Sequence, residues 1–393
     1  MFNGDRMKVC VILRADLYRP WPILRAAREV ELLRSQGKDV TVVSWIKEKN
    51  STLPPTEVVG EVEIRRIFLE PPKSILFRFP AFLKANKSLA RAAIDTEADA
   101  LLVHDLEVLR AGVLAKKRLG VPLVYHAHED WPAMVSERSG LEARVFSFLE
   151  RRYCKIVDNV LVPSKGIGKK YVEWGLKVTV QYASKSIDGL PSVTPEKRAD
   201  LRARYGIKEA DLVVGLAGSL GRAEAFDNIL AAMKELPESV KLLVVGGLEE
   251  KVRSAKQAVA SAGLAQRVRF TGFLDPTPYM EHVGVLDVGL ALFIGKTLNV
   301  IQVAPIKLFD YMAMGVPMVA SEFPAMKEII EECGCGITAN SEDPHSIASA
   351  IKMFFDHPDQ RAQASRKARL AFESKFSWER QQIALKEASS VFR

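Results

Sequence analysis

Short apolar runs alternate with amphipathic stretches along the chain, and this alternation occurs twice. The first series of strand-like runs covers 8–13, 39–45, 62–70, 100–105, 121–128, 157–164 and 178–183, and the second covers 211–220, 240–247, 268–274, 285–293, 316–321 and 335–340. Strands that alternate with helices predict a parallel sheet with helices on both faces. A chain of 393 residues is also too long for one ordinary core. The sequence therefore predicts two α/β domains.

Residues 184–205 interrupt the alternation with polar, charged and proline-containing sequence. Such a composition predicts a linker that enters a helix. We therefore expect an N-terminal domain over residues 1–185 and a C-terminal domain over residues 206–376. A last helical segment begins at FSWERQQ and covers residues 377–393.

The composition is that of a soluble globular protein, with 48% hydrophobic and 26% charged residues. The opening MFNGDRMKV leads straight into a strand-like run, so no signal peptide is expected. The most apolar stretch, residues 283–295, is too short to span a membrane and contains Asp287. Four cysteines without a framework predict a reducing compartment, and the Cys333–Cys335 pair has no second pair for zinc. We expect a cytoplasmic protein.

The positive charge is concentrated in the first half of the chain. Residues 1–185 contain 31 Lys and Arg against 22 Asp and Glu, whereas the remainder contains 25 and 26. The basic, partly apolar segment 71–93 predicts peripheral contact with an anionic membrane on its cytoplasmic face. The alternative is a crossover helix whose basic side chains are solvated. Basic and aromatic residues do not interleave, so nucleic acid is not an expected partner.

Half of the six histidines lie within 25 residues, at HDL and YHAHEDW. His104, His126 and His128 follow strand-like runs, and Glu129 and Asp130 come directly after. Ligands of open α/β sheets bind at the carboxyl ends of the strands, which favours a sugar-binding site here. Two alternatives stay open: structural histidines at a strand end, or a metal site, although the three histidines make no firm ligand set.

Two stretches of the second half suggest a nucleotide site. GSLGR, residues 218–222, is a glycine-rich turn after a strand, and Arg222 adds a positive charge. In APIKLFDYMAMGVPMVAS, residues 304–321, Pro305 predicts a helix start and Gly315 its end. Lys307 in the first turn suits a phosphate, and Asp310 on the same helix face suits ribose hydroxyls. The alternative is an ordinary capped helix with an ion pair between these two residues.

Together, HDL, Y-x-A-HE, GSLGR and residues 304–321 resemble the family-4 retaining glycosyltransferases, also called group 1. The resemblance covers nearly the whole chain. It implies the GT-B fold: two Rossmann-like parallel-sheet domains that face each other across a cleft, with a C-terminal helix that crosses back to the N-terminal domain. The N-terminal domain would bind the acceptor, and the C-terminal domain would bind the nucleotide sugar.

The resemblance also implies roles for individual residues. His128, with Glu129 and Asp105, would form the catalytic set, and Asp310 stands at the second glutamate of the family's E-x7-E motif, with Gln302 at the first. The donor-binding residues would be Gly218, Ser219, Arg222, Gly247, Phe273, Gln302, Lys307, Leu308 and Asp310. The acceptor side would include Arg19, Trp21, His104 and Asp130, since LYRPWP replaces the family's glycine loop.

The expected function is therefore retaining, metal-independent transfer of a sugar from a UDP- or GDP-sugar to a lipid-linked or glycan acceptor at the membrane surface. No cofactor is expected, because Arg222, Lys307 and backbone amides offset the diphosphate charge and the cleft elements contain no Asp-x-Asp. Two other functions remain. One is a nucleotide-sugar epimerase, which needs acid and base carboxylates. The other is a non-catalytic subunit of the same fold.

Overall fold

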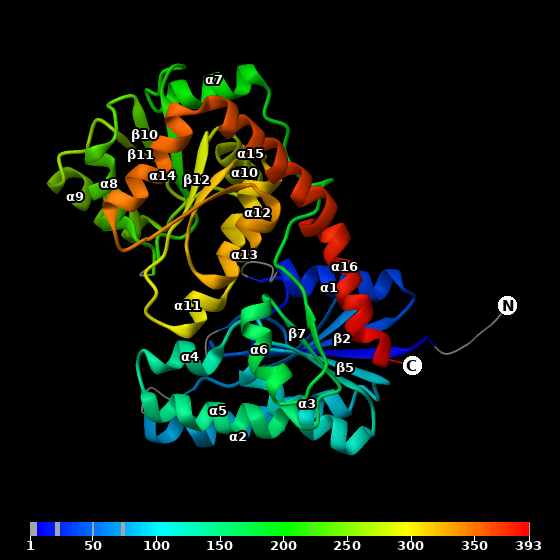
Figure 1. Cartoon of the computed structure of the whole chain (residues 1–393). Coiled ribbons are helices and arrows are strands. Elements are labelled where there is room, and N and C mark those ends of the chain that lie inside the picture. Colours follow the sequence, from blue (N-terminus) through cyan, green and yellow to red (C-terminus); the bar gives the residue numbers. More distant parts are fainter. Residues whose placement is uncertain (1–5, 20–23, 49–50, 72–74, 222, 393) are drawn as a thin grey trace. The chain divides into compact units, whose positions relative to one another are not determined.

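The computed structural model describes residues 6–19, 24–48, 51–71, 75–221 and 223–392 (Figure 1). The chain divides into two compact units. The N-terminal unit comprises Met1–Gln181 and Gln382–Arg393, and the C-terminal unit comprises Tyr182–Gln381. The segment expected to be a linker, residues 184–205, belongs to the C-terminal unit and contains helix α7 (Pro195–Arg204).

The N-terminal unit contains one sheet, with strand order β3-β4-β2-β1-β5-β6-β7-β8. Its pairs are parallel except β3 with β4. The strands are β1 (Lys8–Leu13), β2 (Asp39–Ile46), β3 (Thr56–Val59), β4 (Val62–Phe68), β5 (Ala100–His104), β6 (Leu123–His126), β7 (Asn159–Val162) and β8 (Val178–Val180). The helices are α1 (Leu24–Ser35), α2 (Ile75–Ile94), α3 (Leu106–Leu119), α4 (Trp131–Ser136), α5 (Gly140–Cys154) and α6 (Lys165–Glu173).

The C-terminal unit contains a parallel sheet of order β11-β10-β9-β12-β13-β14. Its strands are β9 (Leu212–Ala217), β10 (Val240–Val245), β11 (Val268–Phe270), β12 (Val288–Ala291), β13 (Met318–Ser321) and β14 (Gly336–Ala339). Besides α7, its helices are α8 (Phe226–Glu235), α9 (Glu249–Ser261), α10 (Pro276–Gly284), α11 (Leu298–Gln302), α12 (Ile306–Ala313), α13 (Pro324–Cys333), α14 (Pro344–Asp356) and α15 (Pro358–Ala371), and a π-helical turn follows at Phe372–Phe376.

Alternate residues of the central strands pack into two separate cores. In β9, Leu212, Val214 and Leu216 belong to one buried cluster, whereas Val213 and Ala217 belong to the other. Successive side chains of a strand point to opposite faces, so each face of this sheet is covered by helices. This explains why the strands appear in the sequence as continuous apolar runs rather than alternating ones.

The last helix connects the two units. α16 (Trp378–Ala388) begins in the C-terminal unit, and from Gln382 onward the chain belongs to the N-terminal unit. There the Lys38 ammonium lies 5.4 Å from the centre of the Phe392 ring. The return of the C-terminal helix that the resemblance implied is thus confirmed.

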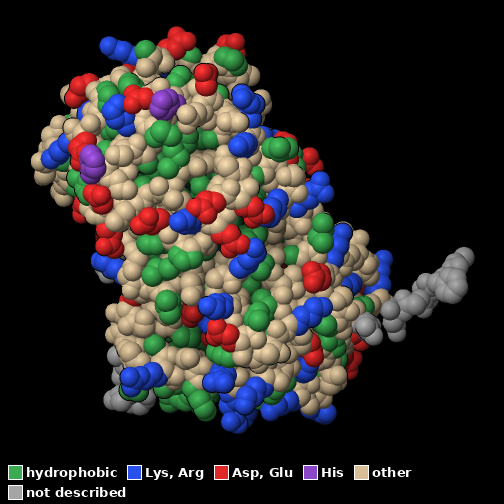
Figure 2. All heavy atoms as spheres, in the orientation of Figure 1, with side chains coloured by type: hydrophobic (Ala, Val, Ile, Leu, Met, Phe, Trp, Pro, Cys, Tyr) green, Lys and Arg blue, Asp and Glu red, His purple; other side chains and the backbone are tan. Residues whose placement is uncertain are grey.

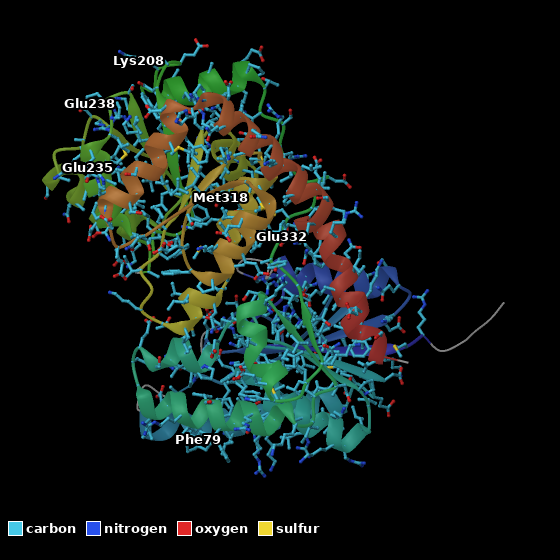
Figure 3. The ribbon with its side chains drawn as sticks, viewed as in Figure 1. Phe79, Lys208, Glu235, Glu238, Met318 and Glu332 are labelled. Carbon is cyan, nitrogen blue, oxygen red and sulfur yellow. The ribbon has the colours of Figure 1, made fainter. Side chains whose placement is uncertain are left out.

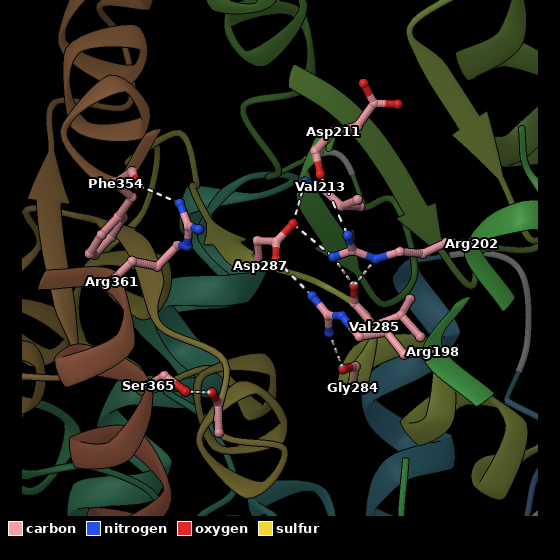
Figure 4. A network of polar contacts seen from close by, with 11 residues as sticks. Arg198, Arg202, Asp211, Val213, Gly284, Val285, Asp287, Phe354, Arg361 and Ser365 are labelled. Atoms are coloured by element: carbon pink, nitrogen blue, oxygen red, sulfur yellow. Dashed lines mark hydrogen bonds and ion pairs between the residues drawn. The ribbon is translucent and has the colours of Figure 1, made fainter. Parts of the chain in front are cut away.

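A partly buried ionic network holds α7 against the sheet of the C-terminal unit (Figure 4). Asp287, just before β12, accepts hydrogen bonds from Arg198, from Arg202 and from the backbone amide of Val213. Because Arg202 also donates to the Val285 carbonyl, its buried guanidinium has both charge and hydrogen-bond compensation. The network lies at the amino ends of β9 and β12, opposite the carboxyl ends where the candidate site described below lies.

In the part of the chain that the structure describes, no helix is long and apolar enough to cross a membrane.

Candidate active site

The strand order of the N-terminal sheet places its crevice between β1 and β5. From this pair the chain adds strands in both directions: β2, β4 and β3 lie beyond β1, and β6, β7 and β8 lie beyond β5. The gap between β1 and β5 is therefore the topological switch point. His104 is the last residue of β5 and His126 the last of β6, and the two residues pair in register. Their side chains therefore meet at the carboxyl edge, where the sequence predicted a site.

The three predicted histidines form one cluster. His104 Nδ1 lies 2.9 Å from His128 Nε2, and the rings of His126 and His128 are 4.5 Å apart. His104 and His126 are buried, whereas His128 is partly exposed. Burial lowers the pKa of His104 to about 3, against the opposing field of Glu29, and it holds the pKa values of His126 and His128 well below 6.5. All three rings are therefore neutral at pH 7.

The cluster has two charged neighbours from helix α1 that the sequence did not identify. Glu29, fully buried, lies 3.1 Å from His126 Nδ1 and 3.4 Å from His104 Nε2. Arg25 Nη1 lies 3.3 Å from His126 Nε2. The two residues are four apart in a helix and so share one face, which was the only signal available in the sequence.

Asp105 and Arg14 form the second feature of this edge. Asp105 has φ 71° and ψ 151°, a conformation that a residue with a Cβ rarely adopts. Such strain costs of order 1–3 kcal/mol and is concentrated at functional sites. The Asp105 carboxylate accepts from Arg14 Nε at 2.8 Å, and burial raises its pKa although Arg14 opposes the shift. Arg14 was not predicted, because a single arginine after a strand carries no local signal.

These groups line a cavity of about 870 Å³ within the N-terminal unit. Its wall includes Arg14, Arg19, Trp45, Lys47, Asp105 and His128. Arg19 and His104, two of the predicted acceptor-side residues, line this cavity, and their role in acceptor binding stays a prediction, whereas Trp21 lies outside the described residues.

The two acids of YHAHEDW have different environments. Burial raises the pKa of Glu129, and the neighbouring Asp105 charge raises it further. Asp130 accepts from the Ala133 amide at the start of α4 and lies 3.1 Å from Lys170 Nζ. Asp130 therefore has a structural role, and the described wall of the cavity contains neither acid.

The histidine cluster is the one group of described residues with the spacing of a metal site. One nitrogen from each ring lies within 4.8 Å of the others. The Arg25 guanidinium, 3.3 Å from one of the three rings, opposes a cation here and offsets the Glu29 carboxylate, which lies 3.1 Å from the same ring. The arrangement suits hydrogen bonding to a neutral polar ligand better than it suits a divalent ion.

The C-terminal sheet has the strand order of a dinucleotide-binding fold, with its switch point between β9 and β12. Gly218 follows β9 with φ 112°, and Gly246 follows β10 with φ 96°. A Cβ on Gly246 would lie 3.0 Å from the Gly218 carbonyl oxygen, so only glycine lets these two turns approach. The predicted glycine-rich turn therefore approaches the turn after β10 closely, beside the switch point, while Arg222 lies outside the described residues.

Lys307 lies beside this glycine-rich turn. A Cβ on Gly218 would be 3.9 Å from Lys307 Cε. The Lys307 ammonium lies 3.3 Å from Glu224 Oε1 and 4.8 Å from the centre of the Phe293 ring. Burial lowers its pKa, and Glu224 opposes the shift. The chain thus brings together one buried cation, the Gly218 backbone and the end of β12, as an anion site requires.

Asp310 does not pair with Lys307, contrary to the alternative considered from the sequence. Its carboxylate instead binds Lys185 Nζ and accepts a hydrogen bond of 3.0 Å from the Tyr279 hydroxyl. Asp310 is only 3% exposed, so a ribose would have to displace one of these partners. Its role in ribose binding stays a prediction.

The remaining predicted donor residues differ in accessibility. Ser219 and Phe273 are exposed, and Gln302, at the end of α11, is partly exposed. Gly247 is buried next to the Leu220 side chain. Leu308 is fully buried in the core, so its side chain cannot contact a ligand and only its backbone could.

Comparison with known proteins agrees with this geometry. The model "Glycosyl transferase 4-like domain" matches residues 23–184, and the model "Glycosyl transferases group 1" matches residues 211–357. The chain belongs to the group 1 glycosyltransferases. The family-4 resemblance of the sequence is thereby confirmed, and each matched segment contains one of the two sites described above.

The relatives of this glycosyltransferase chain are distant. A D-inositol 3-phosphate glycosyltransferase of Segniliparus rotundus is 26% identical over 69% of this chain, and the match spans 61% of that relative's length. A phosphatidyl-myo-inositol mannosyltransferase of Mycobacterium leprae is 24% identical over 82% of this chain and 80% of its own. An E. coli trehalose-6-phosphate structure bound with UDP-2-fluoro glucose has a TM-score of 0.75 at 12% identity and covers 97% of this chain and 99% of its own. The predicted GT-B fold class is confirmed.

Proposed function

We propose that this chain is a retaining, metal-independent glycosyltransferase that moves a sugar from a UDP- or GDP-sugar to a lipid-linked or glycan acceptor. The observation that carries the proposal is the pair of polar sites, one at the switch point of each sheet. One offers a buried cation beside the glycine-rich turn, and the other offers neutral histidines at a cavity of about 870 Å³. An anion site and a hydroxyl-binding site are the two parts that transfer from a nucleotide sugar needs.

The proposed mechanism depends on the atoms at which charge develops in the transition state. Transfer with retention passes through an oxocarbenium-like transition state, and negative charge grows on the leaving diphosphate. Groups that bind this charge more strongly as it develops accelerate the step. Lys307 and the backbone amides after β9 supply that positive field from the protein itself. His128 forms a hydrogen bond with a sugar hydroxyl and thereby orients the sugar.

The nucleotide class can be tested by thermal unfolding with UDP, GDP, ADP and CMP and their sugars, each with and without EDTA. A ligand at one hundred times its dissociation constant stabilises the folded state by about 2.7 kcal/mol, so the melting temperature rises by several degrees. We expect a shift with UDP or GDP and its sugars, equal in EDTA, together with EDTA-resistant transfer. A shift abolished by EDTA would contradict metal independence. Binding without transfer or donor hydrolysis would favour the non-catalytic subunit.

We further propose that the N-terminal unit docks on anionic membranes through α5 and α2. On α5, Leu141, Val145 and Phe148 are exposed at 75%, 38% and 66% and share one helix face. Arg144, Arg151 and Arg152 are exposed on the same helix, and α2 contributes exposed Phe79, Lys84, Lys87 and Arg91. The two helices touch where the rings of Phe82 and Phe146 meet at 5.9 Å. Apolar side chains ringed by basic ones suit an anionic lipid surface.

The surface that α2 and α5 form is visible in the space-filling view. Figure 2 shows green hydrophobic side chains beside blue basic ones along the edge of the N-terminal unit that α2 and α5 form in Figure 1. Figure 3 labels Phe79 at this edge. The surface thus extends beyond the segment predicted from the sequence, residues 71–93, to the exposed apolar side chains of α5. Residues 72–74 lie outside the described part of the chain.

Vesicle binding tests the docking surface. The double substitution Leu141→Ser and Phe148→Ser is expected to lower binding to phosphatidylserine-containing vesicles at least about tenfold, since each lost side chain removes about 1.5–3 kcal/mol of apolar burial. Leu370→Ser, at a similarly exposed leucine of the C-terminal unit, is the matched control. Co-sedimentation at two salt concentrations measures the effect. Equal binding by all three proteins would reject the surface.

A further inference from the structure

A continuous chain of polar contacts runs from α1 to the cavity of the N-terminal unit. Arg25 Nη1 lies 3.3 Å from His126 Nε2, and His126 Nδ1 lies 3.1 Å from Glu29 Oε1. Glu29 Oε2 lies 3.4 Å from His104 Nε2, and His104 Nδ1 lies 2.9 Å from His128 Nε2. His128 is the histidine of this chain that is partly exposed, and it lines the cavity.

The position of every proton in this chain follows from its two fixed members. A guanidinium carries only donors and an ionised carboxylate only acceptors. Burial raises the pKa of Glu29, whereas the neighbouring Arg25 opposes the shift and favours the ionised form. Arg25 therefore requires a bare nitrogen at His126 Nε2, so the proton of neutral His126 is on Nδ1, where it faces Glu29. On the other side, His104 Nε2 lies 3.4 Å from the same carboxylate without the alignment of a hydrogen bond, and a bare nitrogen there would set two lone pairs against each other. The His104 proton is therefore on Nε2.

The contact between His104 and His128 extends this proton assignment to the residue that lines the cavity. With its proton on Nε2, neutral His104 presents a bare Nδ1 to His128. A 2.9 Å contact between two nitrogens needs one proton, so His128 supplies it from Nε2. The Nδ1 of His128 is then the bare nitrogen of that ring.

We propose that Glu29 and Arg25 are positioning residues that fix His128 as the Nε2–H tautomer, so that its Nδ1 accepts a hydrogen bond from a hydroxyl group of the substrate. The assignment selects a ligand that donates, such as a carbohydrate hydroxyl, and disfavours a carbonyl or phosphate oxygen at the same place. The identity of that hydroxyl as part of a transferred sugar or its acceptor rests on the proposed function, but the tautomer does not.

The burial of the cluster agrees with this proton arrangement. Glu29 and His126 are 0% exposed and His104 is 2% exposed, so no water competes for their hydrogen bonds. Low polarity makes an unpaired or wrongly paired group there cost about 1–3 kcal/mol. The opposite tautomers of His104 and His128 would turn the lone pair of His104 Nε2 toward the Glu29 carboxylate, so the arrangement with the proton on His104 Nε2 dominates.

Nitrogen-15 NMR of histidine-labelled full-length protein at pH 7 tests the tautomer without any substrate. Two-bond couplings from the ring protons distinguish a protonated from a bare nitrogen, and loss of the signals in His128→Asn assigns them. We expect His128 with a protonated Nε2 and a bare Nδ1. The opposite tautomer, a doubly protonated ring or an averaged signal would overturn the proposal, and none of these outcomes depends on enzymatic activity.

The variant Glu29→Gln tests the origin of the tautomer. A neutral amide lacks the negative charge that holds both ring protons toward position 29, and its nitrogen can present a donor to one of the two rings. We expect His128 signals averaged between the two tautomers, and sugar transfer that is slower by at least about tenfold. For comparison, neutralising the orienting carboxylate of a serine-protease triad lowers kcat about 10⁴-fold. Glu31→Gln, the same change on the exposed face of α1, leaves both unchanged.

The two measurements separate failures of the two proposals. The expected tautomer in a protein without transfer would leave the network standing and reject the proposed function. Active transfer with an unchanged His128 tautomer in Glu29→Gln would reject the positioning role. If Glu29→Gln does not fold, the measurement on the unsubstituted chain still decides the tautomer.

Discussion

His128→Ala is expected to lower the rate of sugar transfer by about 10²- to 10⁴-fold, the range for loss of a positioned group that acts by hydrogen bonding or proton transfer. His128 is the partly exposed member of the histidine cluster and lines the cavity, so its ring is the one that a substrate reaches. Turnover at saturating donor measures the loss, with the melting temperature of the N-terminal unit measured alongside.

The fold should survive this substitution. The truncation removes the partner of His104 Nδ1, which costs about 1–3 kcal/mol, less than the stability of an ordinary domain. His345→Ala is the control, since His345 is exposed in the C-terminal unit and its imidazole pairs with Glu235. Wild-type turnover in His128→Ala would remove the histidine from the mechanism.

Lys307→Met is expected to lower kcat/KM for the nucleotide sugar by about 10²- to 10³-fold, the cost of losing one preorganised group at a developing charge. The substitution keeps an unbranched apolar side chain and removes the ammonium group, which lies 4.8 Å from the centre of the Phe293 ring. It also leaves Glu224, whose side chain is 7% exposed, without its ion-pair partner. A buried carboxylate without its partner destabilises the fold by about 3–5 kcal/mol.

The double variant Lys307→Met with Glu224→Gln separates these two effects. Because the glutamine carries no charge, most of the lost stability should return, whereas the affinity for the diphosphate should not. Melting temperature and kcat/KM measured on both variants give the comparison, and Lys327→Met on the exposed surface of α13 is the control. Wild-type kcat/KM in the stable double variant would show that Lys307 does not contact the donor.

Local sequence patterns predicted most of the secondary structure. The run KVCVIL became β1, and the helix expected from Pro305 to Gly315 is α12, with Gly315 at φ 65° beyond its end. These elements were predictable because both faces of the sheet are buried and because glycine is the residue that best tolerates the left-handed conformation. β3 was missed, since its residues are half-exposed and pair only at the sheet edge.

The candidate sites were predicted only in part. His104, His128, Gly218 and Lys307 follow strands or start a helix, so their positions could be inferred from the chain order. Their partners could not be inferred in this way. Glu29 meets His126 across 97 positions of sequence, and Lys185 meets Asp310 across 125.

The sequence by itself determined two α/β domains and the strand ends where polar side chains gather, because burial and turn formation act over a few neighbouring residues. The order of the strands, and with it the two switch points, depended on which strands pair in space. Only that pairing brings β5 beside β6 and α1 over both, so that an acid and an arginine of one helix set the proton positions of three histidines. Local periodicity specifies a face of a helix, but the tertiary structure decides what that face meets.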